Sequence, residues 1–272
     1  MLVEMNRQFD ILIIDDEQVI TEAVNKICSA EGFKVDASLN ALDALSKLGK
    51  NSYRLIICDI MLPEMDGFQF LSEVNKKRLI TPVIMTTGYS TVENAVRSLY
   101  GGAIDFIPKP FTADELLSSV YRGFKYLEIQ KKLADSKNAE NDETIIYVPC
   151  PAKYFRLGYP SWVNSESTGS AIIGVTDLFL KTIESIDNIE LLKIDNEIVQ
   201  GNSCAQIKTK EDLFHSVLSP LSGRIIELNN KLLEDKSIIE KDPYFDGWLY
   251  RVIPSDWEYE IKNLTPCSSD RL

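Results

Sequence analysis

Short apolar runs recur along the first half of the chain at the spacing of buried strands. Three of them are unbroken, and two weaker candidates carry a polar residue. Unbroken apolar runs are typical of parallel strands that are buried on both faces. The predicted strands cover residues 11–14, 33–35, 55–58, 83–85 and 103–107.

Between these runs, apolar residues repeat at the three- and four-residue spacing of amphipathic helices. The repeats lie within residues 20–27, 42–48 and 92–99. Strands that alternate with helices predict an α/β fold with a doubly wound, five-stranded parallel sheet. Ligands of such sheets lie outside the carboxyl ends of the strands, so functional side chains are expected there.

The second half has a different pattern, with short β-type runs separated by frequent turn residues. The runs cover residues 171–175, 190–194 and 223–228, and helical stretches are expected near 177–186 and 229–239. This pattern predicts a mainly β domain. Residues 134–143 contain no large apolar side chain, which is typical of a linker. We therefore expect domains at 1–130 and 144–272, joined by a helical extension and linker at 131–143.

Composition narrows the classes of function. The 272 residues carry a net charge of −12, and residues 1–143 and 144–272 each contribute −6. An acidic chain lacks the basic surface that nucleic acids need, so we expect no nucleic-acid partner. No apolar run approaches the ~20 residues of a membrane span, and Glu4, Asn6 and Arg7 argue against a signal peptide. We expect a cytoplasmic protein with no membrane partner.

The cysteines and the histidine exclude further chemistry. The five cysteines form no Cys-x-x-Cys pair and are odd in number, which favours reduced thiols over a disulfide framework or a zinc site. His215 is the only histidine, so a metal site built on several histidines is excluded.

Acidic side chains follow two of the predicted strands. Asp15 and Asp16 come directly after the first strand, and Asp59 after the third. Carboxylates that converge raise one another's pKa values unless a cation is present, and hard oxygen ligands suit Mg²⁺. Thr87 and Lys109 follow the fourth and fifth strands. A carboxylate nucleophile, a metal, a hydroxyl and an ammonium are the groups needed to form an acyl phosphate.

Four segments, in order and with the expected spacing, resemble the response-regulator receiver domain over residues 8–130. They are FDILIIDDE (9–17), ICDIMLPEMDG (57–67), PVIMTTG (82–88) and IDFIPKPF (104–111). A match in several parts is far more specific than one short motif. Singly, the Asp pair could cap a helix and the lysine could be a solvated charge.

The resemblance implies a role for each site residue. Asp59 would accept the phosphoryl group, while Asp15, Asp16, Asp59 and the backbone carbonyl of Met61 would organise Mg²⁺. Lys109 would hold a phosphoryl oxygen. Thr87 and Phe106 would form the switch pair, in which the hydroxyl moves toward the phosphate and the ring turns inward. Gly88 stands where the family often has alanine, which loosens that loop.

The apolar pattern after Phe111 continues as a helix toward Leu133. One side of this helix should pack on the sheet. Its later turns, around residues 126–133, could transmit the signal, form a receiver-mediated homodimer contact, or simply end an ordinary final helix.

A second resemblance covers residues 144–260. The segments YPSWV (159–163), GVTD (174–177), SPLSG (219–223) and DPYFDGWL (242–249) are similar to the H-protein of the glycine cleavage system. This family implies a barrel-sandwich hybrid fold, related to lipoyl and biotinyl carrier domains. Its chemistry depends on one hairpin lysine that carries lipoate through an amide.

The lysine position of that family falls on a carboxylate here. Counting back from Ser219 without a gap gives Asp212, and a one-residue insertion gives Glu211. Neither side chain can accept lipoate. Lys210 and Lys208 are close by, but a solvated surface role is favoured for both. We therefore expect a domain that has lost its lipoyl lysine and carries no lipoate.

These observations favour a two-component response regulator that a sensor histidine kinase phosphorylates on Asp59 with Mg²⁺. The second domain would bind an unknown protein target rather than DNA. The chain would be no enzyme beyond assisting its own phosphotransfer and dephosphorylation. Alternatives are a phospho-regulated lipoyl carrier modified on Lys210 or Lys208, and a DNA-binding transcription factor.

Overall fold

The computed structural model describes residues 7–136 and 146–271. The predicted linker at 134–143 and the N-terminal residues Glu4 and Asn6 lie largely outside this range. The described chain forms two compact units, and each is described by itself. The predicted domain boundaries at 130 and 143 stay predictions, although helix α5 continues as far as Ser136.

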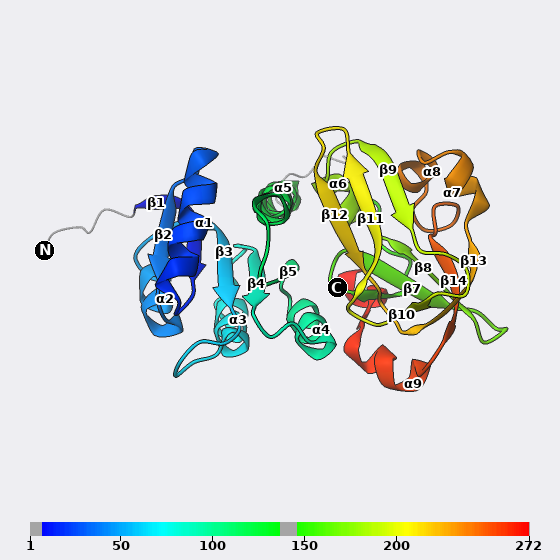
Figure 1. The fold of residues 1–272 in the computed structure, drawn as a ribbon, viewed down its shortest axis with the longest axis horizontal. Helices are drawn as coiled ribbons and strands as arrows, with labels where there is room; N and C mark the ends of the chain where they lie inside the picture. Colours follow the sequence, from blue (N-terminus) through cyan, green and yellow to red (C-terminus); the bar gives the residue numbers. More distant parts are fainter. Residues whose placement is uncertain (1–6, 137–145, 272) are drawn as a thin grey trace, which may run out of the picture. The chain divides into compact units, whose positions relative to one another are not determined.

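Five parallel strands form one sheet in the order β2-β1-β3-β4-β5 (Figure 1). The strands are β1 (Gln8–Ile14), β2 (Val35–Ser38), β3 (Ser52–Asp59), β4 (Val83–Thr87) and β5 (Asp105–Pro108). The helices that follow them in sequence are α1 (Gln18–Ala30), α2 (Ala41–Leu48), α3 (Gly67–Lys76), α4 (Val92–Tyr100) and α5 (Ala113–Ser136). This is the predicted five-stranded α/β fold, in the strand order of flavodoxin-like sheets.

The central strands of this sheet are buried along both faces. Ile11, Leu12, Leu55 and Ile56 are all inaccessible to solvent, as the unbroken apolar runs predict. On one face, Leu12 and Ile56 pack in a core with Phe70 from α3. This rigid centre fixes the positions at which the strands end.

Local signals in the sequence set the helix ends near the site. The side chain of Asn40 accepts a hydrogen bond from the backbone N–H of Asp43 and caps α2. Asp66 and Gln69 form a reciprocal capping box at the start of α3, with bonds of 2.7 and 3.0 Å. Such boxes satisfy two backbone N–H groups that the first turn leaves unpaired.

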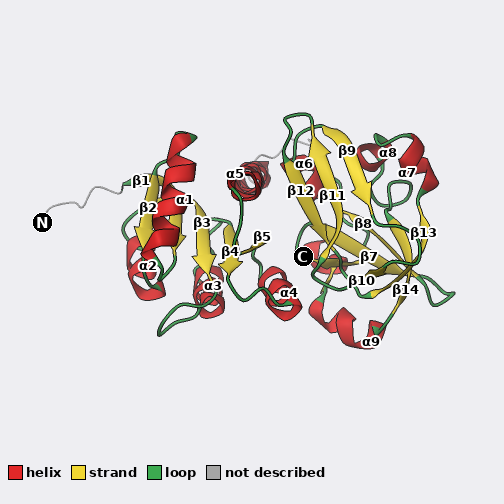
Figure 2. Cartoon of the chain, viewed as in Figure 1, coloured by secondary structure: helices red, strands yellow, loops and turns green. Residues whose placement is uncertain are grey.

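The second unit is built mainly from antiparallel strands (Figure 2). A seven-stranded sheet has the order β10-β13-β14-β8-β7-β6-β15, and a three-stranded sheet has the order β12-β11-β9. The strands are β6 (Phe155–Leu157), β7 (Ser161–Ser165), β8 (Ala171–Val175), β9 (Ile186–Leu191), β10 (Glu197–Ile198), β11 (Ser203–Thr209), β12 (Phe214–Leu218), β13 (Gly223–Leu228), β14 (Tyr250–Pro254) and β15 (Thr265–Pro266).

Short helices complete this unit. They are α6 (Asp177–Thr182), α7 (Asn230–Glu234), α8 (Ile238–Lys241), α9 (Trp257–Glu260) and the 3₁₀ helices η1 (Ile261–Asn263) and η2 (Cys267–Arg271). Trp162 and Tyr244 are buried in one core cluster of the unit together with two cysteines. The predicted mainly β class of the second half is confirmed.

Several predicted elements differ from the structure at their ends. The strands predicted at 103–107 and 190–194 are β5 (Asp105–Pro108) and β9 (Ile186–Leu191). Strand β2 begins at Val35 because Phe33 still belongs to the end of α1, where its N–H donates to the carbonyl of Cys28. Gly32, with φ +83°, makes this helix end possible. Strand β9 begins at Ile186, so the predicted helix at 177–186 ends early, and the helix expected over 229–239 is two short helices.

No helix within residues 7–136 and 146–271 is long and apolar enough to cross a bilayer.

Candidate functional site

Three neighbouring strands bring the predicted Asp15, Asp59 and Thr87 to one edge of the sheet, and Lys109 directly follows the next strand, β5. Strand β1 ends one residue before Asp15, and Asp59 and Thr87 are the last residues of β3 and β4. The pairing of Ile14 with Cys58, and of Asp59 with Thr86, keeps these ends level. The carboxyl edge of the sheet therefore holds the candidate site.

Lys109 lies between the two buried carboxylates. Its Nζ is 2.6 Å from Oδ2 of Asp15 and 3.1 Å from Oδ1 of Asp59. Asp15 is inaccessible to solvent, Asp59 is 4% exposed, and the Lys109 side chain is 10% exposed. A third carboxylate, that of Glu17, is 3.9 Å from the same ammonium and is exposed. The structure brings Asp15, Asp59 and Lys109 together as predicted from their places along the chain.

Backbone groups hold each buried carboxylate in place. The N–H of Met61 donates to Oδ2 of Asp59 at 3.1 Å, and the N–H of Glu17 donates to Oδ1 of Asp15 at 3.1 Å. These bonds favour the charged carboxylates and fix their orientation. Met61 itself is exposed, on the loop that follows Asp59.

Burial and charge act in opposite directions on these groups. Burial raises the pKa of Asp15 and of Asp59 above its ordinary value, although Lys109 partly offsets the effect. Burial alone would lower the pKa of Lys109, but Asp15 and Asp59 outweigh it and raise that pKa. The site therefore holds a firmly charged lysine beside carboxylates that are easier to protonate than usual.

The carboxylates fit a divalent cation. One oxygen from each of Asp15, Asp16 and Asp59 lies within 4.8 Å of the other two, and Asp16 is exposed to solvent. Oδ1 of Asp59 is buried and, within the described residues, accepts no hydrogen bond of good geometry. The Lys109 ammonium is the ion-pair partner of this oxygen, and a hard cation such as Mg²⁺ also prefers carboxylate oxygen.

The predicted switch residues lie next to the site on separate strands. Thr87 is buried, and its Oγ1 accepts a hydrogen bond of 3.1 Å from the N–H of Tyr89. The carbonyl of Thr87 accepts a bond from the N–H of Lys109, which ties the ends of β4 and β5 together. Phe106 on β5 is half-buried and packs against the core.

Two residues that shape the acidic site, Glu17 and Gly67, were not predicted from the sequence. Glu17 adds a negative charge near Lys109, and the run Asp15-Asp16-Glu17 was its only signal. Gly67 begins α3 so close to Asp59 that an added Cβ would lie 2.3 Å from the Asp59 carbonyl oxygen. Helix α3 was also not predicted, although the Asp66-x-x-Gln69 spacing is a capping-box signature.

In the second unit, the hairpin of β11 and β12 presents the predicted lipoyl position at its turn. Thr209 accepts a backbone bond from Asp212, so Lys210 and Glu211 occupy the centre of the turn. Asp212 has φ +60° and ion-pairs with Lys208 at 2.6 Å. Lys210 is exposed and makes no ion pair within the described residues.

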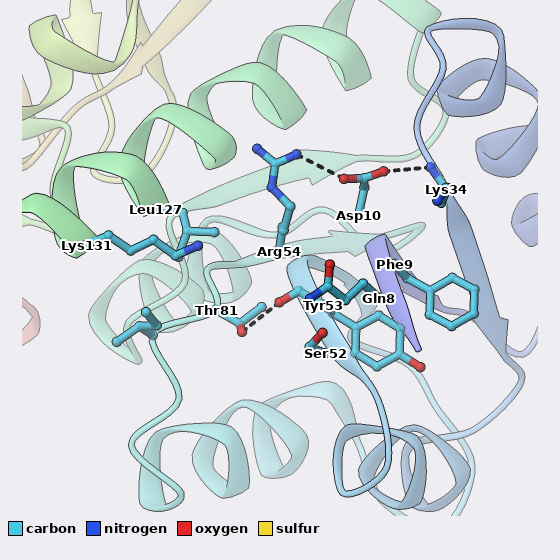
Figure 3. A pocket seen from close by; sticks show the side chains of 11 residues that line it. Gln8, Phe9, Asp10, Lys34, Ser52, Tyr53, Arg54, Thr81, Leu127 and Lys131 are labelled. Carbon is cyan, nitrogen blue, oxygen red and sulfur yellow. Dashed lines mark hydrogen bonds and ion pairs between the residues drawn. The ribbon is translucent and has the colours of Figure 1, made fainter. Parts of the chain in front are cut away.

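A cavity of about 460 Å³ lies at the opposite edge of the parallel sheet (Figure 3). It opens beside Gln8 and Ser52, where β1 and β3 begin, and Lys34, Arg54 and Lys131 contribute to its lining. Asp10 pairs with Arg54 at 2.9 Å across this cavity. Because Asp59 is at the carboxyl end of β3, the cavity is separate from the acidic site.

The fold and the acidic site define this class of protein. An α/β domain with a buried aspartate, acidic neighbours and a lysine is followed by an antiparallel β domain. The model of the response regulator receiver domain matches residues 11–121, and that of the glycine cleavage H-protein matches residues 153–268. The chain carries a receiver domain followed by an H-protein domain, which confirms both resemblances.

Two curated relatives and one solved structure are similar to part of this chain. A putative NtrX-like response regulator of Rickettsia bellii is 34% identical over 137 residues, or 50% of this chain and 29% of that protein. Regulatory protein AtoC of Escherichia coli is 35% identical over 45% of this chain and 27% of its own length. The chain thus spans about three tenths of these curated relatives. The crystal structure of the NtrX receiver domain from Brucella abortus shares 37% identity, covering 43% of this chain and 98% of that one, with a TM-score of 0.41.

Proposed function

We propose that this protein is the response regulator of a two-component pathway and that a sensor histidine kinase phosphorylates it on Asp59. The observation that carries the proposal is the buried Asp59 carboxylate, 3.1 Å from the Lys109 ammonium and beside Asp15. A receiver domain and response-regulator relatives support the pathway.

The geometry supports a simple division of work. An oxygen of Asp59 attacks the phosphorus of a phosphohistidine, the P–N bond breaks, and an acyl phosphate forms. The Met61 N–H orients the carboxylate, and the Lys109 ammonium stabilises the charge on the phosphoryl oxygens. Asp15, Asp16 and Asp59 would hold Mg²⁺, which neutralises charge on the transferred group. The proposed role requires no enzymatic activity beyond assistance of the protein's own phosphotransfer and dephosphorylation.

Thr87 and Phe106 are the proposed readout of the phosphoryl group. The group adds a charge of about −1.5 to −2 and new acceptor oxygens near pH 7. The Thr87 hydroxyl, which now accepts from Tyr89, would donate to a phosphoryl oxygen, and Phe106 would pack further inward. Full switching from 1:99 to 99:1 requires about 5.5 kcal/mol of differential interaction.

The test is phosphotransfer from a phosphorylated histidine kinase, or from acetyl phosphate with Mg²⁺, followed by intact mass. The wild type should gain one phosphoryl group and Asp59→Asn none. Asp66→Asn is the matched control, because it removes a nearby charge and keeps a good helix cap. Undiminished labelling of Asp59→Asn would overturn the proposal.

For the second domain we propose a protein-binding output without lipoate. The support is that counting back from Ser219 brings the family's lysine position to a carboxylate of the hairpin turn, Asp212 without a gap or Glu211 with a one-residue insertion. The acidic charge of −6 over residues 144–272 argues against DNA. DNA retained by these residues at physiological salt, and released as salt rises, would reverse the output proposal.

One observation favours a second candidate, a phospho-regulated lipoyl carrier. Lys210 lies exposed in the same hairpin turn, whereas Lys208 is ion-paired to Asp212. Co-expression with a lipoyl ligase and intact mass distinguishes the two. A mass increase that matches lipoate and is absent in Lys210→Arg would establish the lipoyl carrier. No mass increase would favour the protein-binding output domain. We also propose a cytoplasmic location and a homodimer that forms through the receiver domain.

A further inference from the structure

Two cysteines that are far apart in sequence meet in the core of the second domain. The sulfur atoms of Cys150 and Cys267 lie 2.7 Å apart, although 117 positions separate the residues. Cys150 is 4% exposed and Cys267 is inaccessible to solvent. Both pack in the cluster that contains Trp162 and Tyr244. The two sulfur atoms are in direct contact, as the formation of a disulfide bond of ~2.05 Å requires.

Separate elements hold the two residues in place. Cys267 begins η2 directly after β15, and its N–H donates to the carbonyl of Tyr154 at 2.9 Å. Cys150 lies in the segment that enters the domain. In that segment, the N–H of Val148 donates to the side chain of Asp177, and the carbonyl of Val148 accepts a hydrogen bond from the hydroxyl of Tyr244. The contact between the sulfur atoms therefore follows from the fold of the domain at both of its ends.

We propose that Cys150 and Cys267 form a reversible disulfide when the protein meets hydrogen peroxide. Val148 and Pro149 are exposed beside Cys150, so a small oxidant approaches this sulfur more easily than Cys267. The site lies outside the acidic site of the receiver domain and uses none of its groups.

The reaction balances in two steps. The Cys150 thiolate attacks one peroxide oxygen, an S–O bond forms, the O–O bond breaks, and hydroxide leaves with the thiol proton as water. Cys267 then attacks the sulfur of Cys150. The S–S bond forms, the S–O bond breaks, and the second hydroxide takes the Cys267 proton. Two sulfur atoms lose two electrons, and one peroxide becomes two waters.

The bond would tie the first segment of the domain to its last helix. A disulfide that closes a long loop restricts the unfolded chain, so the oxidised domain should melt about 10 °C higher than the reduced one. Oxidation would also fix the segment through which the chain enters the domain. A cell's oxidation state would thereby act on the second domain independently of Asp59.

The experiment treats the folded full chain with hydrogen peroxide and then counts thiols after denaturation. The number should fall from five to three. Non-reducing peptide mapping should show the Cys150 and Cys267 peptides joined, with a mass lower by two hydrogen atoms. Dithiothreitol should restore all five thiols.

Variants separate this pair from the other cysteines. Cys150→Ser and Cys267→Ser should each abolish the cross-link, and the matched control Cys204→Ser, another buried cysteine of the domain, should retain it. Peptide mapping of the wild type needs no variant, so a variant that fails to fold leaves the test intact. Five thiols in the treated folded chain, sulfinic acid without a cross-link, or a different cysteine pair would overturn the proposal. Phosphorylation of Asp59 is measured separately and is unaffected by any of these outcomes.

Discussion

At the scale of single residues, the receiver site depends on one ammonium between two buried carboxylates. Asp15 and Asp59 are almost fully buried, and each lies close to Nζ of Lys109. A buried charge that loses its partner is costly, because water can no longer solvate it. Lys109 therefore has a structural role in addition to its proposed role in phosphotransfer.

Replacing Lys109 with methionine keeps an unbranched side chain, one atom shorter, and removes the charge. We expect Lys109→Met to lower the free energy of unfolding by about 3 kcal/mol at pH 7, because it leaves two buried carboxylates unpaired. Urea unfolding measures the effect. Lys76→Met is the control, because water screens the exposed pair of Lys76 and Glu73 and its loss should change the free energy of unfolding little. Equal losses in both variants would contradict this role of Lys109.

The raised pKa values of Asp15 and Asp59 predict the pH dependence of cation binding. Protons compete with Mg²⁺ for the same oxygens, so the apparent affinity should begin to fall at a higher pH than ordinary aspartates would give as the solution is acidified. In the absence of metal, these two carboxyl groups bind more protons in the folded state than in the unfolded state between 3.8 and the raised values. Their contribution to stability should therefore decrease as pH rises through that window. Calorimetric titration with Mg²⁺ at several pH values, and urea unfolding without metal, measure the two effects.

At the scale of elements, the start of α3 determines the position of Asp59. Gly67 is the first residue of this helix, and an added Cβ would lie 2.3 Å from the Asp59 carbonyl oxygen and 2.9 Å from Cα of Ile60. Both are backbone atoms, so no side-chain rotation can relieve the overlap. The helix can approach β3 this closely only with glycine at this position.

Two alanine substitutions test whether the close approach at Gly67 matters, or whether any glycine near the site would show the same effect when replaced. Gly67→Ala should destabilise the protein by about 2 kcal/mol or more and slow phosphorylation, because Asp59 must shift. Gly88→Ala should be neutral or stabilising by up to about 1 kcal/mol, since nothing lies within 4 Å of its added Cβ. Thermal unfolding and phosphotransfer rates measure both. A harmless Gly67→Ala would show that α3 can move away from β3 without loss.

The apolar pattern of the sequence predicts some parts of the site and of its elements and not others. Asp15, Asp59 and Lys109 could be placed because each follows an apolar strand run, and parallel strands align their carboxyl ends. Helix α3 was missed because its apolar face is short and follows a loop, while the capping signal at Asp66 went unused. The end of α1 at Phe33 depends on the left-handed conformation of Gly32, which apolar periodicity does not indicate. Contacts such as that between Cys150 and Cys267 arise only from the tertiary fold.

At the scale of the whole molecule, the chemistry of the first domain is confined to a short part of the chain. Every group of the acidic site lies between Asp15 and Lys109. The second domain has its own buried cluster around Trp162 and Tyr244. Phosphotransfer and Mg²⁺ binding should therefore need no residue of the second domain.

A fragment of residues 1–136 tests this independence. It should accept a phosphoryl group on Asp59 at a rate within about a factor of 3 of the full chain, because no group of the acidic site is removed. Two-fold to three-fold changes correspond to well under 1 kcal/mol. The same kinase assay, run on the fragment and on the full chain, gives the comparison. A much slower fragment that is still folded by circular dichroism would mean that the second domain takes part in phosphotransfer.

The two-residue strand β15 has a consequence for solubility. It forms one edge of the seven-stranded sheet, where Thr265 pairs with Arg156 and Pro266 with Phe155. An exposed strand edge can recruit another chain, and proline discourages this because it has no N–H to donate. Without this last strand, β6 would present an open edge, and copies of the protein could associate through it. The final strand thus helps to keep the protein from aggregating.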